Sequence, residues 1–552
     1  MAKNNIGTEP IYDARKLGYP RMGILGFQHL FAMFGATVLV PIITGLDVQT
    51  TLLMAGLGTL LFHLLTKFKV PAFLGSSFAF LGGYAAVSGG NPENLPYACL
   101  GVACAGLLYV VLALVIKLVG IQRVMKLFPP VVTGPIIIAI GLCLAPTALN
   151  SCASCWPLAL IALATVVAFN IWGRGMSKII PILIGVVVAY ICALIFGNWL
   201  GWFPESGQVA LGEIAKADWV GLPIHWGKTV FGGVFGNNPD KAKIVAAITT
   251  MVPIAIATMM EHIGDICAIG ATCDRDYINE PGLHRTLLGD GLATTLASLF
   301  GGPANTTYGE NTGVLALSKV YDARVIRIAA YIAILLSFSP KFASLIEFMP
   351  SGIVGGISFM LYGMIAAIGV RNVVEARVDF SKSRNVIVAA IIVVCALGIK
   401  YSPGMGGFLA PAGDPTIPVS HVVVQDEKGN TNAELNLESV EKVDEKTGKT
   451  VIDKKTKEPV MINQGSYQEF SKDKKLEPKQ YNPNENTSYV ASGNGDTGDG
   501  SVKFTIGGVK FSLSGLAIAA LAGIILNLLF PDKDPVILHG GVEKFDEEEK
   551  EE

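Results

Sequence analysis

Long apolar stretches separated by short polar loops dominate the chain. A transmembrane helix needs about 20 predominantly apolar residues, and fourteen stretches approach that length. They cover residues 23–44, 50–66, 71–88, 97–119, 125–147, 156–173 and 179–202 in the first half, and 244–270, 286–301, 304–318, 324–346, 351–370, 385–400 and 510–530 in the second. The pattern predicts an all-α polytopic membrane protein with 14 transmembrane segments.

The third segment of each half is a poor helix. Residues 71–83 and 303–313 are short, rich in small and polar side chains, and interrupted by Gly and Pro. Broken segments at corresponding positions of two halves indicate the binding site of a transporter. Proline-containing sequences also lie near the start of the fifth segment, at 128–130, and directly before the twelfth, at 348–350. Because seven is an odd number of crossings, the two halves are predicted to form inverted repeats.

Lysine and arginine in the short loops predict the orientation, because cytoplasmic loops carry an excess of both. With the N-terminus inside, the loops between segments 1–2, 3–4, 5–6 and 9–10 lie outside and contain neither residue. The cytoplasmic loops then contain Lys67, Lys69, Lys117, Arg123, Lys126, Arg174, Lys178, Arg275, Arg285, Lys319, Arg324, Arg327, Arg371, Arg377, Lys382 and Arg384. Both termini are therefore expected in the cytoplasm of a cell whose plasma membrane holds the protein.

A long polar region interrupts the apolar pattern near the C-terminus. Thirteen acidic and 11 basic residues lie between His421 and Asn486, and valines around Thr447-Gly448 predict a small β-hairpin. The expected divisions are a cytoplasmic N-terminus at 1–22, transmembrane segments 1–13 at 23–400, a polar extracytoplasmic insert at 401–508, segment 14 at 509–531 and an acidic cytoplasmic tail at 532–552. The insert is expected to be a surface appendage.

The composition agrees with a membrane protein and excludes other classes. Hydrophobic residues make up 51% and charged residues 16% of the chain, and the mean hydropathy is +0.50. Soluble domains usually contain about a quarter charged residues. A formal net charge of −2 argues against a nucleic-acid-binding surface. No nucleophile–base pair or metal-ligand cluster stands out, so neither an enzyme, a metal site nor a cofactor is expected.

The nine cysteines are scattered, mostly within apolar runs. Such cysteines usually behave as small buried hydrophobic residues. Cys152 and Cys155 form one close pair without a nearby histidine, which argues against a zinc site. A disulfide between them requires an oxidising compartment, and the sequence leaves this pairing open.

Ionisable residues inside the predicted segments are the candidates for function, because burying a charge in the bilayer is costly. Glu261 and Asp265 lie four residues apart on one face of the eighth segment. Asp290, Glu310 and the histidines His29 and His262 also fall within segments. A structural role is expected for the histidines, whereas Glu261 and Glu310 are the favoured functional carboxylates.

The broken segments add backbone groups to this set. A half-helix that begins at midplane presents free N–H groups and the positive end of its dipole. Such groups are expected near Phe78 in the third segment and near Tyr308 and Gly309 in the tenth, with Tyr362 as a further aromatic. Carboxylate acceptors, backbone donors and aromatic faces together match a flat, neutral heterocyclic amide. An inorganic anion fits poorly, because the carboxylates would repel it.

At these residues the sequence resembles the nucleobase/ascorbate transporter family, in its uracil permease branch. The resemblance is carried by the stretches 28–35 (QHLFAMFG), 71–80 (PAFLGSSFAF), 261–264 (EHIG) and 305–311 (NTTYGEN). It covers nearly the whole chain except the insert and the acidic tail.

The resemblance implies a core domain of segments 1–4 and 8–11 and a gate domain of segments 5–7 and 12–14. By the family pattern Glu261 and Glu310 hydrogen-bond the nucleobase, backbone groups at Phe78 and Gly309 meet its other edge, and Tyr362 faces it from the gate. His29 matches a histidine that hydrogen-bonds within the core. The implied partners are uracil, a proton and the lipid bilayer, and a homodimer stays open.

Asp265 departs from the family pattern, because uracil carriers have a histidine four residues after the first glutamate. We expect protons to be coupled through Asp265, Glu261, Glu310 and His29, with sodium as the alternative ion. A xanthine or other purine carrier of the same fold is the nearest rival function. An anion exchanger or channel on this architecture is a more distant one.

Overall fold

The computed structural model describes residues 6–7, 9–88, 91–120, 123, 126–174, 180–236, 239–401 and 509–530 and, between 421 and 506, the strands alone. The side chains of Glu310, Lys400 and Tyr401 and those of 421–513 are outside this description. The chain divides into one unit of Met1–Leu397 with Ile506–Glu552 and a second of Gly398–Thr505.

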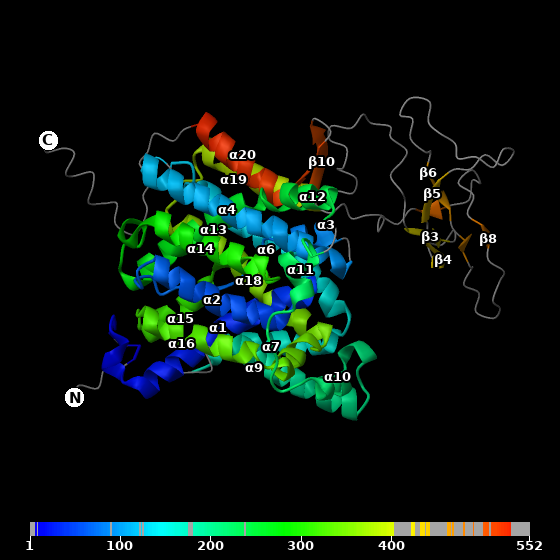
Figure 1. Ribbon diagram of the computed structural model, residues 1–552, viewed down its shortest axis with the longest axis horizontal. Coiled ribbons are helices and arrows are strands. Elements are labelled where there is room, and N and C mark those ends of the chain that lie inside the picture. The colour runs from blue at the N-terminus through cyan, green and yellow to red at the C-terminus, as the bar shows by residue number, and fades with distance from the viewer. Residues whose placement is uncertain are drawn as a thin grey trace. The chain divides into compact units, whose positions relative to one another are not determined.

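The first half of the larger unit contains helices that follow the predicted segments in order (Figure 1). They are α1 (Tyr19–Thr44), α2 (Val48–Leu65), α3 (Leu81–Ser88), α4 (Leu95–Val119), α6 (Pro130–Ala153), α7 (Trp156–Trp172) and α9 (Pro181–Cys192), which continues as η3 (Ala193–Trp199). Short helices α10 (Leu211–Lys216) and α11 (Val230–Gly233) lead to the second half.

The second half of the larger unit is also made mostly of helices. It contains α12 (Lys241–Met251), α13 (Ile254–Cys273), α14 (Leu283–Leu299), α15 (Gly309–Ser318), α16 (Ala323–Ser337), α17 (Pro340–Glu347), α18 (Ser351–Glu375), α19 (Ser383–Tyr401) and α20 (Gly515–Leu529). Short one-turn helices are η1 (Ala14–Leu17), η2 (Pro92–Asn94), η4 (Glu205–Gly207), η5 (Trp226–Lys228) and η6 (Ile278–Gly282).

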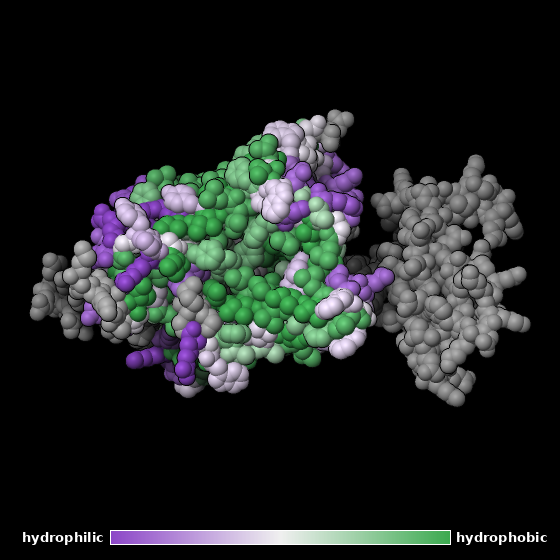
Figure 2. All heavy atoms as spheres, turned by 90° about the horizontal axis from the view of Figure 1, so that it is seen from below, coloured by the Kyte–Doolittle hydropathy of each residue, from purple (hydrophilic) through white to green (hydrophobic). Residues whose placement is uncertain are grey.

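Among the described residues, seven helices are long and apolar enough to cross a membrane, and one bent helix pair adds an eighth span. Three shorter apolar helices, from Trp156, Ser383 and Gly515, add to these. Hydrophobic side chains cover the middle of the helical unit, and hydrophilic ones gather toward its ends (Figure 2). The larger unit is therefore a multi-pass membrane protein, as the sequence predicts.

Two predicted segments are broken in the structure. The stretch 324–346 forms α16 and α17, which are bent by 92° at the break before Pro340. Proline opens a helix readily at its first position but donates no N–H in a helix interior, and Ser339 caps α17 by accepting from the Phe342 amide. The stretch 244–270 is divided between α12 and α13 near Pro253. One span was expected at each place, and α12 with α13 still makes one candidate span, Lys241–Cys273, whereas α16 and α17 are a bent pair.

The two broken segments of the sequence meet in a short antiparallel sheet. Strand β1 (Leu74–Ser76) pairs with β2 (Asn305–Thr307), and Gly75 lies opposite Thr306. The sheet is extended by hydrogen bonds from Ser77 N to Ala304 O (2.8 Å) and from Tyr308 N to Phe73 O (3.1 Å). All six strand residues are buried. Each strand satisfies the backbone groups of the other, which is how non-helical backbone is tolerated at membrane depth.

The described part of the second unit is made of strands. These are β3 (His421–Gln425), β4 (Thr431–Asn436), β5 (Glu438–Glu441), β6 (Met461–Gln464), β7 (Ser466–Tyr467), β8 (Lys479–Gln480) and β9 (Tyr489–Val490). Strand β3 pairs antiparallel with β4 and β9, and β5 with β6. The turn predicted at Thr447-Gly448 lies outside the described residues. Strands β10 (Ser501–Ile506) and β11 (Val509–Ser514) precede α20.

Candidate functional site

A partly open cavity lies where the β1–β2 sheet meets α13 and two further long helices. The space between its lining residues, counted together with the part that is open to solvent, is about 390 Å³. Its walls combine side chains from both broken segments with others from α6, α13 and α18, namely Phe78, Ile137, Glu261, Asp265, Thr306, Thr307, Tyr308, Gly309, Ile365 and Ile368. The structure thus brings five of the predicted site residues, from three distant parts of the sequence, to one place.

Glu261 and Asp265 reach the cavity from one face of α13, as their spacing predicts. Asp265 is 6% exposed, and its Oδ2 accepts a hydrogen bond of 3.0 Å from the hydroxyl of Thr307. A Cβ built on Gly309 would lie 3.7 Å from Asp265 Oδ1. The Asp265 carboxylate therefore lies beside the amino end of α15, where the helix dipole favours negative charge.

Helix α15 begins at Gly309, with Tyr308 alone between it and the end of β2, and this N-cap residue makes no side-chain cap hydrogen bond with the part of the first turn that the structure describes. Uncapped N–H groups at a helix start are free to bind an acceptor on a ligand. Glu310 follows in the same turn, but its side chain is outside the described part of the structure. The backbone thus provides donors at the point where the sequence places a second carboxylate.

The predicted aromatic residues take different positions. The Phe78 ring lines the cavity and meets the Tyr362 ring edge-on at 5.6 Å between centroids. Tyr362 of α18 is fully buried behind Phe78. Tyr308 also lines the cavity, but its hydroxyl donates to the Ser76 carbonyl at 2.9 Å. Phe78 is therefore the aromatic face open to a ligand, and Tyr308 links the two strands.

His29 lies completely buried in α1. Its backbone carbonyl accepts a hydrogen bond of 3.4 Å from the Asn311 side chain in α15. Among the described residues neither nitrogen of the His29 ring has a hydrogen-bond partner. The core hydrogen bond expected for His29 stays a prediction.

Sequence reasoning missed the apolar wall and one polar wall of the cavity. Ile137 on α6 and Ile365 and Ile368 on α18 close it from the side opposite α13. Isoleucines are common in every segment, so no sequence pattern distinguishes these three. Thr306 and Thr307 stand within the 305–311 stretch singled out above, but a hydroxyl's role there depends on which face of β2 it occupies.

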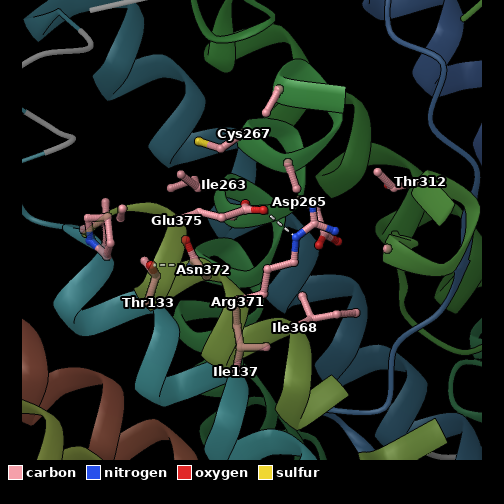
Figure 3. A pocket seen from close by; sticks show the side chains of 17 residues that line it. Thr133, Ile137, Ile263, Asp265, Cys267, Thr312, Ile368, Arg371, Asn372 and Glu375 are labelled. Carbon is pink, nitrogen blue, oxygen red and sulfur yellow. Dashed lines mark hydrogen bonds and ion pairs between the residues drawn. The ribbon is translucent and has the colours of Figure 1, made fainter. Parts of the chain in front are cut away.

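A wider vestibule of about 880 Å³ adjoins the cavity and shares Ile137, Asp265, Gly309 and Ile368 with it. Its other wall carries Arg371, whose guanidinium pairs with Glu375 at 2.6 Å (Figure 3). These residues belong to the end of α18 that the charge pattern assigns to the cytoplasm.

One hydrogen bond crosses the vestibule wall between two helices of the predicted gate. Asn372 on α18 donates to the Thr133 hydroxyl on α6 at 3.1 Å (Figure 3). On the facing helix α13, a Cβ on Gly264 would lie 3.3 Å from Asn372 Nδ2 and 3.4 Å from Ile137 Cδ1. The predicted core and gate therefore touch closely at Gly264.

The arrangement can bind a small planar ligand without covalent chemistry. It offers carboxylate acceptors on α13, backbone donors at the start of α15 and the Phe78 ring as a stacking face. Among the described residues, no three His, Cys, Asp or Glu side chains gather as metal ligands. Cys152 and Cys155 are both buried and unbonded to each other.

Comparisons with known proteins give a consistent picture. Residues 21–405 match the sequence model described as the Permease family. A uracil permease of Bacillus caldolyticus is 44% identical over 384 residues, which cover 68% of this chain and 84% of that protein. A uracil permease of Bacillus subtilis is 40% identical over 397 residues, covering 69% and 86%.

A solved structure supports the fold alone. The transmembrane domain of a cyanobacterial bicarbonate transporter, BicA, superposes with a TM-score of 0.52 at 16% identity and covers 71% of this chain and 97% of that one.

Proposed function

The chain belongs to the permease family of nucleobase transporters, and from this premise we propose that it is a uracil permease that takes up uracil by alternating access. The observation that carries the proposal is the cavity between β1–β2, α13 and α18. Uracil has two ring N–H groups and two carbonyl groups in one plane, and this cavity presents acceptors, donors and an aromatic face to match them. The chain covers 84% of a relative named as a uracil permease.

In the proposed complex, Glu261 and Glu310 accept the two ring N–H groups. Backbone N–H groups at Gly309 and Phe78 donate to the carbonyls, and Phe78 packs on the ring with Tyr362 behind it. A hydrogen bond to a charged acceptor contributes about 1.5–3 kcal/mol in total, compared with about 0.5–1.5 kcal/mol for one to a neutral acceptor. The apolar wall of isoleucines excludes water from the other face.

We further propose fourteen segments in two inverted repeats. Exchanging each segment with the one seven places later should then preserve the packing partners. Helix α4 packs on α14, and the exchange maps this pair onto α16 and α2, which also pack together. Likewise α1 packs on α16, and α12 with α13 packs on α4. The β1–β2 and α6–α18 pairs map onto themselves.

We also propose a plasma-membrane carrier with both termini in the cytoplasm, which the lysine and arginine pattern of the short loops supports. The vestibule beyond Asp265 is bounded by the start of α6 and the ends of α13 and α18. All three lie on the side that the lysine and arginine pattern assigns to the cytoplasm. The cavity accordingly represents an inward-facing conformation, from which uracil leaves past Arg371 and Glu375.

Protons are the proposed coupling ion. Asp265 and Glu261 line the same cavity, and two carboxylates in a low-dielectric site favour sharing a proton over joint ionisation. Sodium is the competing ion, since carboxylate oxygens also suit it.

Transport by the purified chain in liposomes tests both parts of the proposal. Radiolabelled uracil should be exchanged across the membrane, and unlabelled uracil should compete far better than xanthine. An inward proton gradient should drive net uptake in the absence of sodium. Preferred transport of xanthine would contradict the substrate, and uptake driven by a sodium gradient alone would contradict the ion.

A further inference from the structure

A second ionisable cluster lies behind the cavity, where nothing in the proposed uracil complex uses it. His262 on α13 and Asp290 on α14 are both 0% exposed, and Nδ1 of the histidine lies 3.2 Å from Oδ2 of the aspartate. Among the described residues, His262 Nε2 and both carboxylate oxygens of Asp290 have no hydrogen-bond partner, so the contact between the two side chains is an ion-pair distance. A completely buried pair with unsatisfied polar atoms is costly to maintain, which indicates a role beyond packing.

Thr307 connects this pair with the cavity. Its Oγ1 donates to Asp265 Oδ2 at 3.0 Å and lies 3.4 Å from His262 Nδ1. Strand β2 thereby provides one hydroxyl that touches both the cavity carboxylate and the buried histidine. Close contacts thus run from Asp265 through Thr307 to His262 and on to Asp290. Asp265 and His262 come from α13, Thr307 from β2 and Asp290 from α14.

The surroundings of the pair contain few other titratable groups. Helix α2 contributes the Phe62 ring, 6.3 Å from the imidazole centroid, and next to it His63, whose Nε2 contacts the Ala72 carbonyl. Helix α4 contributes Tyr109, which packs on Gly291 and donates to the Thr258 hydroxyl at 2.6 Å.

Glu261 and Asp265 are the titratable neighbours of His262 on α13 itself, and both line the cavity. No described lysine or arginine forms an ion pair with Asp290. A proton on the pair is therefore the charge available within the described surroundings to neutralise Asp290.

We propose that the His262–Asp290 pair holds the coupling proton, which reaches it from Asp265 through Thr307. In the first state Asp265 is protonated and donates to Thr307, whose hydroxyl donates to Nδ1 of a neutral His262 protonated at Nε2. The Thr307 proton then moves to Nδ1 while the Asp265 proton moves to Thr307. The second state contains an ionised Asp265 and a His262 imidazolium paired with ionised Asp290, and no proton is gained or lost.

The physical reason is the charge of the buried pair. A neutral histidine beside ionised Asp290 carries a net negative charge in hydrocarbon, whereas the imidazolium–carboxylate pair is neutral overall. Moving the proton inward also leaves Asp265 ionised next to the amino end of α15, where its charge is stabilised. The inference rests on the proposed proton-coupled uracil transport and adds the residues that carry the proton.

Two kinds of uracil movement separate this role from a structural one. Exchange of labelled for unlabelled uracil in proteoliposomes needs a bound substrate and a moving core, but no net movement of protons. Accumulation driven by an inward proton gradient needs the bound substrate and the moving core, and it also needs net movement of protons. A symporter of one proton can reach about tenfold accumulation for each pH unit of gradient.

Asp290→Asn in the full chain should keep exchange within about threefold of wild type and lose the response of accumulation to the gradient. Thr307→Val should lose the same response; because Thr307 lines the cavity, its exchange rate should fall but stay measurable, and its accumulation is compared with that of wild type at equal exchange. Thr307→Ser should restore the response, because it keeps the hydroxyl. Thr286→Val is the matched control, since Thr286 is buried one turn before Asp290 and its hydroxyl bonds only the Leu283 carbonyl of its own helix.

Thr307→Val carries the test by itself if Asp290→Asn does not fold, because it alters no charge. A full gradient response in Thr307→Val, or equal loss in Thr307→Ser and Thr307→Val, would overturn the inference while leaving the transport function in place. Loss of exchange together with accumulation in folded Thr307→Val would overturn it as well. A wild-type protein that exchanges uracil but ignores the gradient would instead refute proton coupling itself.

Discussion

The ring of Tyr308 lies directly against Gly75 in the opposing strand. A Cβ at Gly75 would be 2.5 Å from Tyr308 Cε2, closer than atoms can approach. The Tyr308 hydroxyl then passes beyond the glycine to the carbonyl of Ser76. The two broken segments are thus held together by one aromatic side chain that only a glycine accommodates.

Gly75→Ala should therefore weaken uracil binding more than the addition of a single methyl group would suggest. The added methyl group must displace Tyr308 or separate β1 from β2, and overpacking of this kind costs about 1–3 kcal/mol. Uracil binding to the purified protein should fall by tenfold or more, on the order of 1.4 kcal/mol. Gly82→Ala is the control, because nothing lies within 4 Å of a Cβ there. Equal binding by the two variants would show that the sheet does not shape the site.

Glu261→Gln should weaken uracil binding while leaving the protein in the membrane. The amide still accepts a hydrogen bond, but the charged acceptor is lost, which costs about 1.5–3 kcal/mol at most. Isothermal titration with uracil measures the effect. Glu375→Gln serves as the comparison, since Glu375 lies in the vestibule and is 44% exposed. The assigned role fails if Glu261→Gln binds uracil as tightly as wild type.

Glu310→Gln should behave in the same way, because the family resemblance gives Glu310 the second ring N–H. We expect near-complete loss of binding in the double variant with Glu261→Gln. If both single variants bind uracil within about threefold of wild type, groups other than Glu261 and Glu310 must accept the ring N–H groups.

Asp265→Asn should weaken the dependence of uptake on external acidity. Removing one of two neighbouring carboxylates lets Glu261 ionise more easily, because like charges no longer oppose it. Uracil binding at alkaline pH should change little, since Glu261, and not Asp265, is the proposed hydrogen-bond acceptor for uracil. Initial uptake rates across a series of external pH values measure the effect. An unchanged pH profile would place proton coupling elsewhere.

Gly264→Ala should slow transport without weakening binding. Its Cβ would be 3.3 Å from Asn372 and 3.4 Å from Ile137, which belong to the predicted gate. In the proposed alternating-access cycle the core and the gate slide past each other, so a tighter contact between them should raise the barrier between the inward-facing and outward-facing states. Uracil exchange should fall several-fold, whereas Gly363→Ala, with open space at its Cβ, should not differ from wild type. Reduced affinity at an unchanged exchange rate would contradict this role.

Joining residue 401 to 509 through a short linker should leave uracil transport intact. The Permease family match ends at residue 405, so the family core lies before the insert except for the last helix. Loops outside the membrane tolerate large changes in length at little free-energy cost. A shortened protein that inserts but does not exchange uracil would make the insert part of the mechanism.

The sequence by itself determined the class of protein, the places of the helices and most candidate site residues. Apolar length and the cost of intramembrane charge are properties of short stretches, so they can be read without knowing which stretches meet. Glu261 and Asp265 share a helix face because of their spacing alone. The family was likewise identifiable from local motifs such as NTTYGEN at 305–311.

Only the tertiary structure decided which partners these residues have. Pairing of Leu74 with Thr307 joins strands more than 230 residues apart, and no local pattern fixes such a register. The same pairing places the Thr307 hydroxyl between Asp265 and His262 and leaves the Tyr308 hydroxyl on Ser76. His262 and Asp290 became a pair because α13 and α14 lie side by side in the core, and long-range packing of this kind depends on every side chain between them.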